Sequence, residues 1–135
     1  MHLYKRIHHV AYRVKDFDAS IAFFEKASKM PIKDQQYHLT SNEEILFFEV
    51  GGTLMEMLRP ADRESRLNKS LEKQGEGFDH IAFEVENIEE ALATLKENGV
   101  KLIDEKPRKG FKWKVADLDP GSTLGVATQI VEIYK

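Results

Sequence analysis

Cysteine is absent from the 135 residues. Its absence excludes disulfides, thiolate nucleophiles and cysteine-ligated zinc, so any metal must be held by His, Asp, Glu, amides or water. No apolar run approaches the about 20 residues that cross a bilayer, and the first residues lack the apolar core of a signal peptide. Neither charge dominates, because 20 basic residues face 23 acidic ones. We therefore expect a cytoplasmic protein with no nucleic-acid or membrane partner.

The sequence contains a long internal repeat with an offset of 71 residues. Ile7–Phe17 aligns with Phe78–Ile88, which matches His9 to His80, and the register continues without a gap to Ile32 and Ile103. Chance alternation of apolar residues would not hold one register across a strand and a helix. The repeat spans half of the chain, so it indicates two similar modules within one domain.

Each module shows the same order of expected elements. An alternating strand opens it, a helix follows, and two or three strands close it. In the first module Asp18 can cap the helix, and Gly51-Gly52 forms a hairpin turn; in the second, Asn87 caps the helix and Gly99 ends it. The sequence predicts an α+β fold of two βαβββ modules, with curved mixed sheets around a metal site. The modules run from about 5 to 60 and about 77 to 135, joined by a linker at about 61–76, in a single domain.

Several blocks of the sequence resemble the vicinal oxygen chelate superfamily, to which glyoxalase I, bleomycin resistance proteins and dioxygenases belong. The likeness is strongest to methylmalonyl-CoA epimerase and to glyoxalase I-like proteins. The blocks that carry it are 8–11, 48–52, 55–60, 75–85 and 99–107. The resemblance implies one divalent metal, held by a residue from the first and the last strand of each module.

Carried over onto this sequence, three of the implied metal ligands are His9, Glu56 and His80. Two imidazoles with carboxylates form an N/O site suited to cobalt, nickel, zinc, manganese or iron(II). Glu56 lies between Met55 and Met57, and a carboxylate on a buried face needs a cation or a donor. Glu56 could instead face outward at an edge, and a histidine on a strand is often just a buried, hydrogen-bonded imidazole.

The fourth ligand has two candidates near the C-terminus. Ungapped alignment nominates Gln129, whereas three extra loop residues align Glu132, which has apolar neighbours on both sides. The two differ by three positions, so a strand places them on opposite faces. We choose Glu132. By the same rule His8, next to His9, is expected on the face opposite His9.

The resemblance implies an enzyme that transfers a proton next to a metal-chelated carbonyl. Glu132 is then the expected catalytic base, and an epimerase needs a second acid/base. The family position for it matches Ile45, with Glu43 and Glu44 just before it, and a slip of one residue nominates Glu44. Alternatives are a glyoxalase I-type lactoylglutathione lyase and, more distantly, a non-catalytic resistance protein that binds small molecules.

The segment 106–114 concentrates five cations and two aromatic residues in a nearly neutral chain. It is either a solvent-exposed edge strand whose lysines prevent pairing with other strands, or a segment that binds an anionic substrate, which we call the substrate handle. As a handle, Lys109 and Lys112 would pair with the phosphates of a CoA thioester or the carboxylate of a glutathione adduct, and Trp113 or Phe111 would stack on an adenine. Curved sheets with open edges, together with the resemblance, also predict a homodimer.

Overall fold

The structure is a computed structural model that describes residues 2–38, 42–110 and 112–135. The chain forms two compact units: Val10–Asp79 is one, and Met1–His9 with His80–Lys135 is the other. Strand β1 (Tyr4–Arg13) and strand β5 (Gly77–Val85) each have residues in both units. Both units thus depend on the same two stretches of backbone.

The first module has one helical segment and four strands. After β1, helix α1 (Asp18–Ser20) continues directly into the π-helix η1 (Ile21–Ala27). Three antiparallel strands follow, and the hydrogen-bonded order is β2-β3-β4-β1. Their bounds are Asp34–His38 for β2, Glu43–Val50 for β3 and Thr53–Pro60 for β4.

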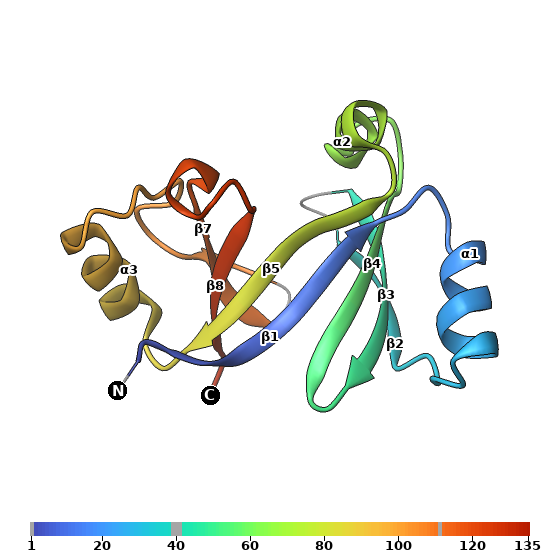
Figure 1. Cartoon of the computed structure of the whole chain (residues 1–135), viewed down its shortest axis with the longest axis horizontal. Helices are drawn as coiled ribbons and strands as arrows, with labels where there is room; N and C mark the ends of the chain where they lie inside the picture. The colour runs from blue at the N-terminus through green and yellow to red at the C-terminus, as the bar shows by residue number, and fades with distance from the viewer. Residues whose placement is uncertain (1, 39–41, 111) are drawn as a thin grey trace. The chain divides into compact units, whose positions relative to one another are not determined.

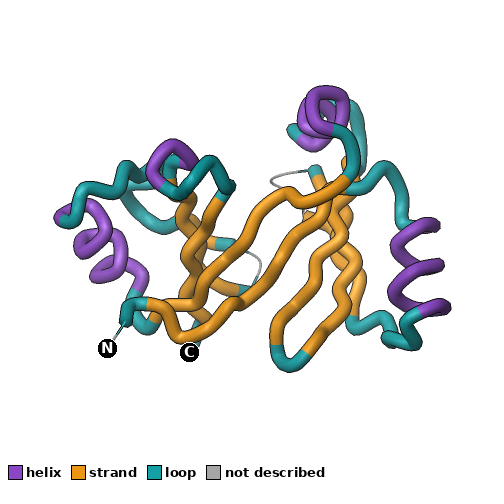
Figure 2. The backbone as a smooth tube through the Cα atoms, viewed as in Figure 1, coloured by secondary structure: helices purple, strands orange, loops and turns teal. Residues whose placement is uncertain are grey.

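The second module repeats this plan. After β5 come helix α3 (Ile88–Glu97) and the strands β6 (Arg108–Lys109), β7 (Trp113–Leu118) and β8 (Thr128–Ile133), with the 3-10 helix η2 (Pro120–Ser122) between the last two. The order β6-β7-β8-β5 is the counterpart of β2-β3-β4-β1. Helix α2 (Leu67–Gln74) joins the modules. The predicted α+β fold of two βαβββ modules is confirmed (Figures 1 and 2).

Each unit encloses its own apolar cluster between strands and a helix. In the unit of residues 10–79, Phe17, Leu46, Phe48 and Met57 are buried, with Phe24 packed against them. In the other unit α3 packs on β7 and β8, as Figure 1 shows; the buried residues are Val85, Ile88, Ala91, Leu92, Ala116, Leu118 and Ile130. On β3 and β4, Leu46, Phe48 and Met57 thus share one packed face, and Glu56 lies on the other face of β4.

Most of the predicted local signals are confirmed. The Asn87 side chain accepts a hydrogen bond from the Glu90 amide, and Gly51, Gly52 and Gly99 have positive φ. The predicted cap at Asp18 is wrong: Phe17 is the N-cap of α1 and makes no side-chain cap. The reason is local, because the Asp16 carboxylate accepts from the Asp18 amide and draws Asp18 into the first turn.

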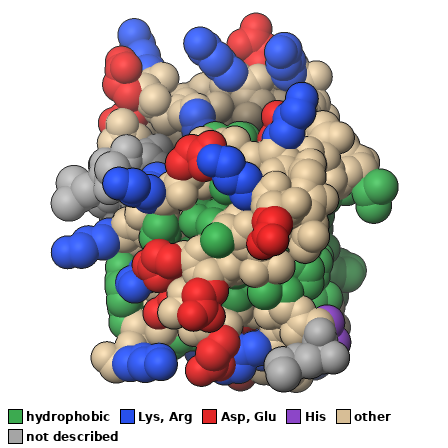
Figure 3. Space-filling view, turned by 90° about the vertical axis from the view of Figure 1, so that its left-hand side faces the viewer, with side chains coloured by type: hydrophobic (Ala, Val, Ile, Leu, Met, Phe, Trp, Pro, Cys, Tyr) green, Lys and Arg blue, Asp and Glu red, His purple; other side chains and the backbone are tan. Residues whose placement is uncertain are grey.

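The surface agrees with the near-neutral composition. In Figure 3, lysine and arginine side chains are interspersed with aspartate and glutamate over the face in view. Within the described residues, no helix is long and apolar enough to cross a membrane.

Candidate metal centre

His9 of β1 and His80 of β5, the two histidines matched by the repeat, meet inside one unit. Their Nε2 atoms are 3.1 Å apart and their rings stand nearly perpendicular, at 83°. Both side chains are buried, with 1% and 7% of their surface exposed. Strands β1 and β5 therefore place the Nε2 atoms of His9 and His80 next to each other.

Burial sets the protonation of His9. Desolvation lowers the pKa of His9 well below 6.5, and the neighbouring His80 and His8 lower it further; a hydrogen bond with Gln129 opposes this in part. A neutral imidazole keeps one nitrogen lone pair, which is what a metal ligand requires. His9 is thus prepared to ligate at neutral pH.

His8 does not follow the expected alternation. It is buried like His9, and its Nδ1 lies 2.8 Å from His9 Nδ1. Both rings lie against Trp113 of β7, at centroid distances of 4.5 Å for His8 and 5.4 Å for His9. The prediction that His8 lies on the opposite face is wrong, because the indole draws both rings to it and the two imidazoles hydrogen-bond each other.

The distance between the two Nε2 atoms fits a shared metal ion. Ligand bonds of about 2.0–2.1 Å at square or tetrahedral angles place two nitrogens roughly 2.8–3.4 Å apart. The observed 3.1 Å falls within that range. The separation of the His9 and His80 Nε2 atoms is therefore compatible with both binding one divalent transition metal.

Glu56 of β4 lies in the other unit and is 4% exposed. Burial raises its pKa to about 8, and the nearby carboxylates of Glu43 and Asp79 contribute to the rise. It is therefore inward-facing, and the alternative of an exposed edge carboxylate is excluded. A bound cation would relieve this unfavourable environment.

Two arginines accompany these carboxylates. Arg66 contacts Glu43 at 3.4 Å and Asp79 at 3.1 Å. Arg13 is buried, lies 3.5 Å from Asp79, and donates to the carbonyls of Gly75 and Phe78. These guanidiniums partly balance the charge of Glu43 and Asp79, the two carboxylates that raise the pKa of Glu56.

The register of the β3–β4 hairpin separates Glu43 from Glu44. Phe47 pairs with Glu56, so Glu43, four residues earlier on β3, lies on the same face as Glu56. Glu44 lies on the face of Leu46 and Phe48, which pack against η1. There it forms an ion pair with Arg59 at 2.8 Å. Sequence reasoning passed over Glu43, although the Gly51-Gly52 turn, which pairs Val50 with Thr53, was a signal for this register.

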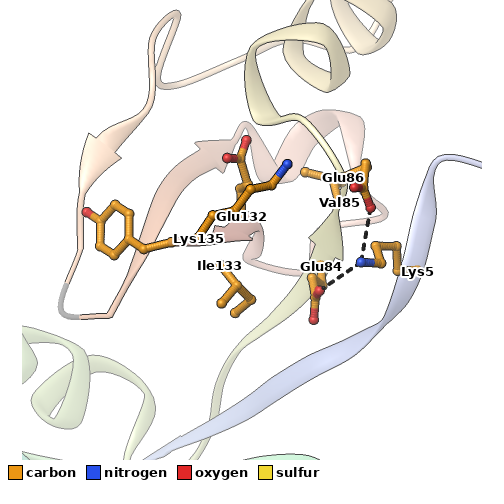
Figure 4. Close-up of a pocket in the computed structure, with 8 residues that line it drawn as sticks. Lys5, Glu84, Val85, Glu86, Glu132, Ile133 and Lys135 are labelled. Atoms are coloured by element: carbon orange, nitrogen blue, oxygen red, sulfur yellow. Dashed lines mark ion pairs between the residues drawn. The ribbon is translucent and has the colours of Figure 1, made fainter.

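Strand β8 directs its two candidates to opposite faces, as expected. Gln129 shares a face with Val131, which packs with Trp113, and it is hydrogen-bonded to His9. Glu132 shares a face with Ile130 and accepts from the Ile88 amide at the start of α3, at 2.8 Å. Figure 4 shows Glu132 on the wall of a surface pocket, beside the ion pairs of Lys5 with Glu84 and Glu86. Glu132 as metal ligand and base stays a prediction, and the position of Gln129 favours the alternative.

The predicted substrate handle divides into two parts. Lys109, on β6, and Lys112, just before β7, are exposed. Trp113 packs with Ala82, Val115 and Val131 and against the histidines. Phe111 lies outside the described residues. The two lysines are therefore at the surface, whereas Trp113 lies against the rings of His8 and His9.

Comparison with known proteins agrees with this picture. The sequence profile of the Glyoxalase/Bleomycin resistance protein/Dioxygenase superfamily matches residues 8–116. The chain belongs to this superfamily. It is 30% identical to the uncharacterized protein YqjC of Bacillus subtilis, over 94% of this chain and 91% of that protein.

Two further relatives extend the comparison. The chain is 29% identical to the mitochondrial methylmalonyl-CoA epimerase of Homo sapiens, over 93% of this chain and 72% of that protein. Among solved structures, the hypothetical protein BH1468 from Bacillus halodurans C-125 superposes with a TM-score of 0.92, at 31% identity, over 96% of this chain and 95% of that one. The glyoxalase-like fold is therefore established for this member of the superfamily.

Proposed function

We propose that this superfamily member is a divalent-metal-dependent enzyme that transfers a proton on the carbon next to a carbonyl, most like methylmalonyl-CoA epimerase. The observation that carries the proposal is the buried His9–His80 pair, with its Nε2 atoms 3.1 Å apart. The epimerase relative supports the reaction class. The non-catalytic resistance protein is less well supported, since such binders need no pair of ligand histidines.

The proposed metal ligands are His9, Glu56 and His80, with a fourth from β8. Glu56 is included because of the family resemblance and because burial and the nearby Glu43 and Asp79 raise its pKa, an effect that a bound cation would oppose. For the fourth, Gln129 is supported by its hydrogen bond to His9, and Glu132 by the family pattern. This N/O set suits cobalt, nickel, zinc, manganese or iron(II).

A divalent ion supplies a Lewis acid that stabilises the negative charge developing on a carbonyl oxygen when the adjacent carbon loses its proton. The chain itself must move that proton. Glu43 is our candidate acid/base, because it lies on the face of Glu56 and is held by Arg66. Glu44, the earlier candidate, is held by Arg59 on the face that packs against η1.

The proposed substrate is an acyl-CoA thioester, and the second candidate is a glutathione adduct. The exposed Lys109 and Lys112 support an anionic handle, although the same lysines could simply guard an edge. The epimerase relative favours the thioester. A homodimer remains part of this proposal, to be checked by light scattering.

The test has two steps. Metal analysis of purified protein should find about one divalent ion per chain, lost in His9→Ala and His80→Ala and retained in the control His2→Ala. NMR in deuterated water should then show exchange of the α-hydrogen of methylmalonyl-CoA. Exchange or product formation with methylglyoxal and glutathione, and none with the thioester, would favour the lyase. A metal-free wild type with full activity would refute the proposal.

A further inference from the structure

His8 is a buried histidine that the proposed ligand set does not use. It is 3% exposed, and its Nδ1 lies 2.8 Å from Nδ1 of His9. Its ring meets Trp113 edge-on, at 4.5 Å and 68°. The His8 side chain thus lies between the indole of Trp113 and the imidazole of His9, a proposed metal ligand.

The short distance between the two Nδ1 atoms determines where a proton must be. Two nitrogens 2.8 Å apart are hydrogen-bonded when one carries hydrogen and the other offers a lone pair. A neutral imidazole has a single ring proton. If His9 uses its Nε2 lone pair for a metal, its proton must be on Nδ1, and Nδ1 of His8, 2.8 Å away, is in place to accept it.

We propose that His8 is a positioning residue that accepts a hydrogen bond from His9 Nδ1–H and so directs the Nε2 lone pair of His9 toward the metal. The inference rests on the proposed metal-dependent function. His8 would then carry its own proton on Nε2. The role resembles that of carboxylates and carbonyls that orient metal-binding histidines elsewhere, except that an imidazole serves as acceptor.

The geometry of His9 makes this contact important. Nε2 of His9 faces Nε2 of His80, so a ring with its proton on Nε2 would place hydrogen where the metal should bind. Gln129 is also hydrogen-bonded to His9, but it lies on β8, whereas His8 is the adjacent residue on β1. Loss of the acceptor at His8 would permit the wrong tautomer and rotation of the ring.

The experiment compares two substitutions at one position. His8→Phe keeps a planar ring against Trp113 and removes the acceptor, whereas His8→Asn keeps an acceptor oxygen at the distance of Nδ1. Zinc affinity is measured by competition with a chromophoric chelator. We expect Phe to weaken binding by about 10- to 100-fold, as for other outer-shell partners of metal ligands, and Asn to stay close to the wild type. His2→Phe, an exposed histidine, is the control.

A spectroscopic measurement needs no variant. Long-range nitrogen–proton NMR of zinc-loaded wild type should show His9 with its proton on Nδ1 and His8 with its proton on Nε2. Unchanged zinc affinity in His8→Phe, equal losses in both variants, or a His8 proton on Nδ1 would overturn the inference. If the wild type binds no metal, the proposed function fails instead. The inference is then decided in metal-free protein, where His8→Phe must change the tautomer populations of His9.

Discussion

Glu56 is a carboxylate whose surroundings disfavour its charged form. It is buried, and Glu43 and Asp79 act on it in the same direction as burial, which raises its pKa to about 8. The folded, metal-free protein therefore prefers Glu56 protonated at neutral pH. A metal ion would reverse that preference, so the same carboxylate is unfavourable without the ion and useful with it.

The first prediction concerns pH and Glu56. Its pKa in the folded protein lies above the ordinary value of 4.5, so the folded state binds the proton more tightly than the unfolded state. This contribution to stability is complete below about pH 4.5 and is lost as pH rises through about 8, by at most ~1.4 kcal/mol per pH unit. Metal-free Glu56→Gln should therefore gain stability relative to the wild type as pH rises. Urea unfolding in chelator at about pH 5 and about pH 8 measures the change. A difference between the two proteins that does not vary with pH would contradict it.

Among the strands, β8 carries the two candidates for the fourth ligand, Gln129 and Glu132, on opposite faces. Gln129 faces His9, whereas Glu132 accepts from the first amide of α3. An acidic group at a helix N-terminus is stabilising by typically 0.3–1 kcal/mol, so Glu132 has a structural role whatever else it does.

The second prediction separates these two residues. Glu132→Gln keeps an acceptor for the Ile88 amide but removes the charge at α3. We expect it to lower stability by about 0.5 kcal/mol and to leave metal content unchanged. Gln129→Leu should instead weaken metal binding with little change in stability. Loss of metal from Glu132→Gln with none from Gln129→Leu would restore Glu132 as the fourth ligand.

The third prediction uses the two faces of β3. Glu43→Gln should lower the rate of α-hydrogen exchange by at least about 100-fold, as expected for loss of a general acid/base. Glu44→Gln should have little effect, because Glu44 pairs with Arg59 on the opposite face. Exchange is followed by NMR in deuterated water, with metal content as the control. Equal rates for wild type and Glu43→Gln would exclude Glu43 and return Glu44 to consideration.

The fourth prediction concerns the lysines around β6. The double substitution Lys109→Glu and Lys112→Glu should raise KM for an acyl-CoA, most strongly at low salt, because screening weakens with falling ionic strength. Metal content should not change. Lys15→Glu and Lys69→Glu together make a control of equal charge in the other unit. An unaltered KM at low salt would mean that these lysines only guard an edge, and would favour a smaller substrate.

At the scale of the whole molecule, the two units share strands. Residues 4–9 of β1 belong to one unit and residues 10–13 to the other, and β5 is divided in the same way after Asp79. Unfolding of either unit removes the end of a strand on which the other depends. Because both units contain parts of β1 and β5, we expect residues 1–135 to behave as a single domain, which stays a prediction. The homodimer also stays a prediction.

The fifth prediction is that metal-free protein unfolds in one cooperative transition. Calorimetric and van't Hoff enthalpies should agree, and far-UV circular dichroism and Trp113 fluorescence should report the same midpoint. Trp113, the sole tryptophan of the sequence, reports on one unit, and circular dichroism reports on both. Separate midpoints would mean that the units unfold independently.

The modules and the histidine pair could be predicted from the order of residues alone. The repeat at an offset of 71 residues aligns the first strand, the helix and the histidine of one module with those of the other. Because the same strand order recurs in each module, His9 and His80 lie next to each other. Asn87 and the Gly51-Gly52 turn could also be predicted, since caps and tight turns depend on neighbouring residues.

The polar side chains around those histidines depend mainly on contacts between segments that are far apart in the sequence. His8 joins His9 because Trp113, about a hundred residues later, attracts both rings, and alternation along one strand contains no information about that contact. Glu132 gained its role at α3 from packing with a distant segment, which a list of residue spacings does not specify. Glu43 and Asp18 differ from these cases, because a neighbouring hairpin turn places Glu43 and the nearby Asp16 holds the Asp18 amide.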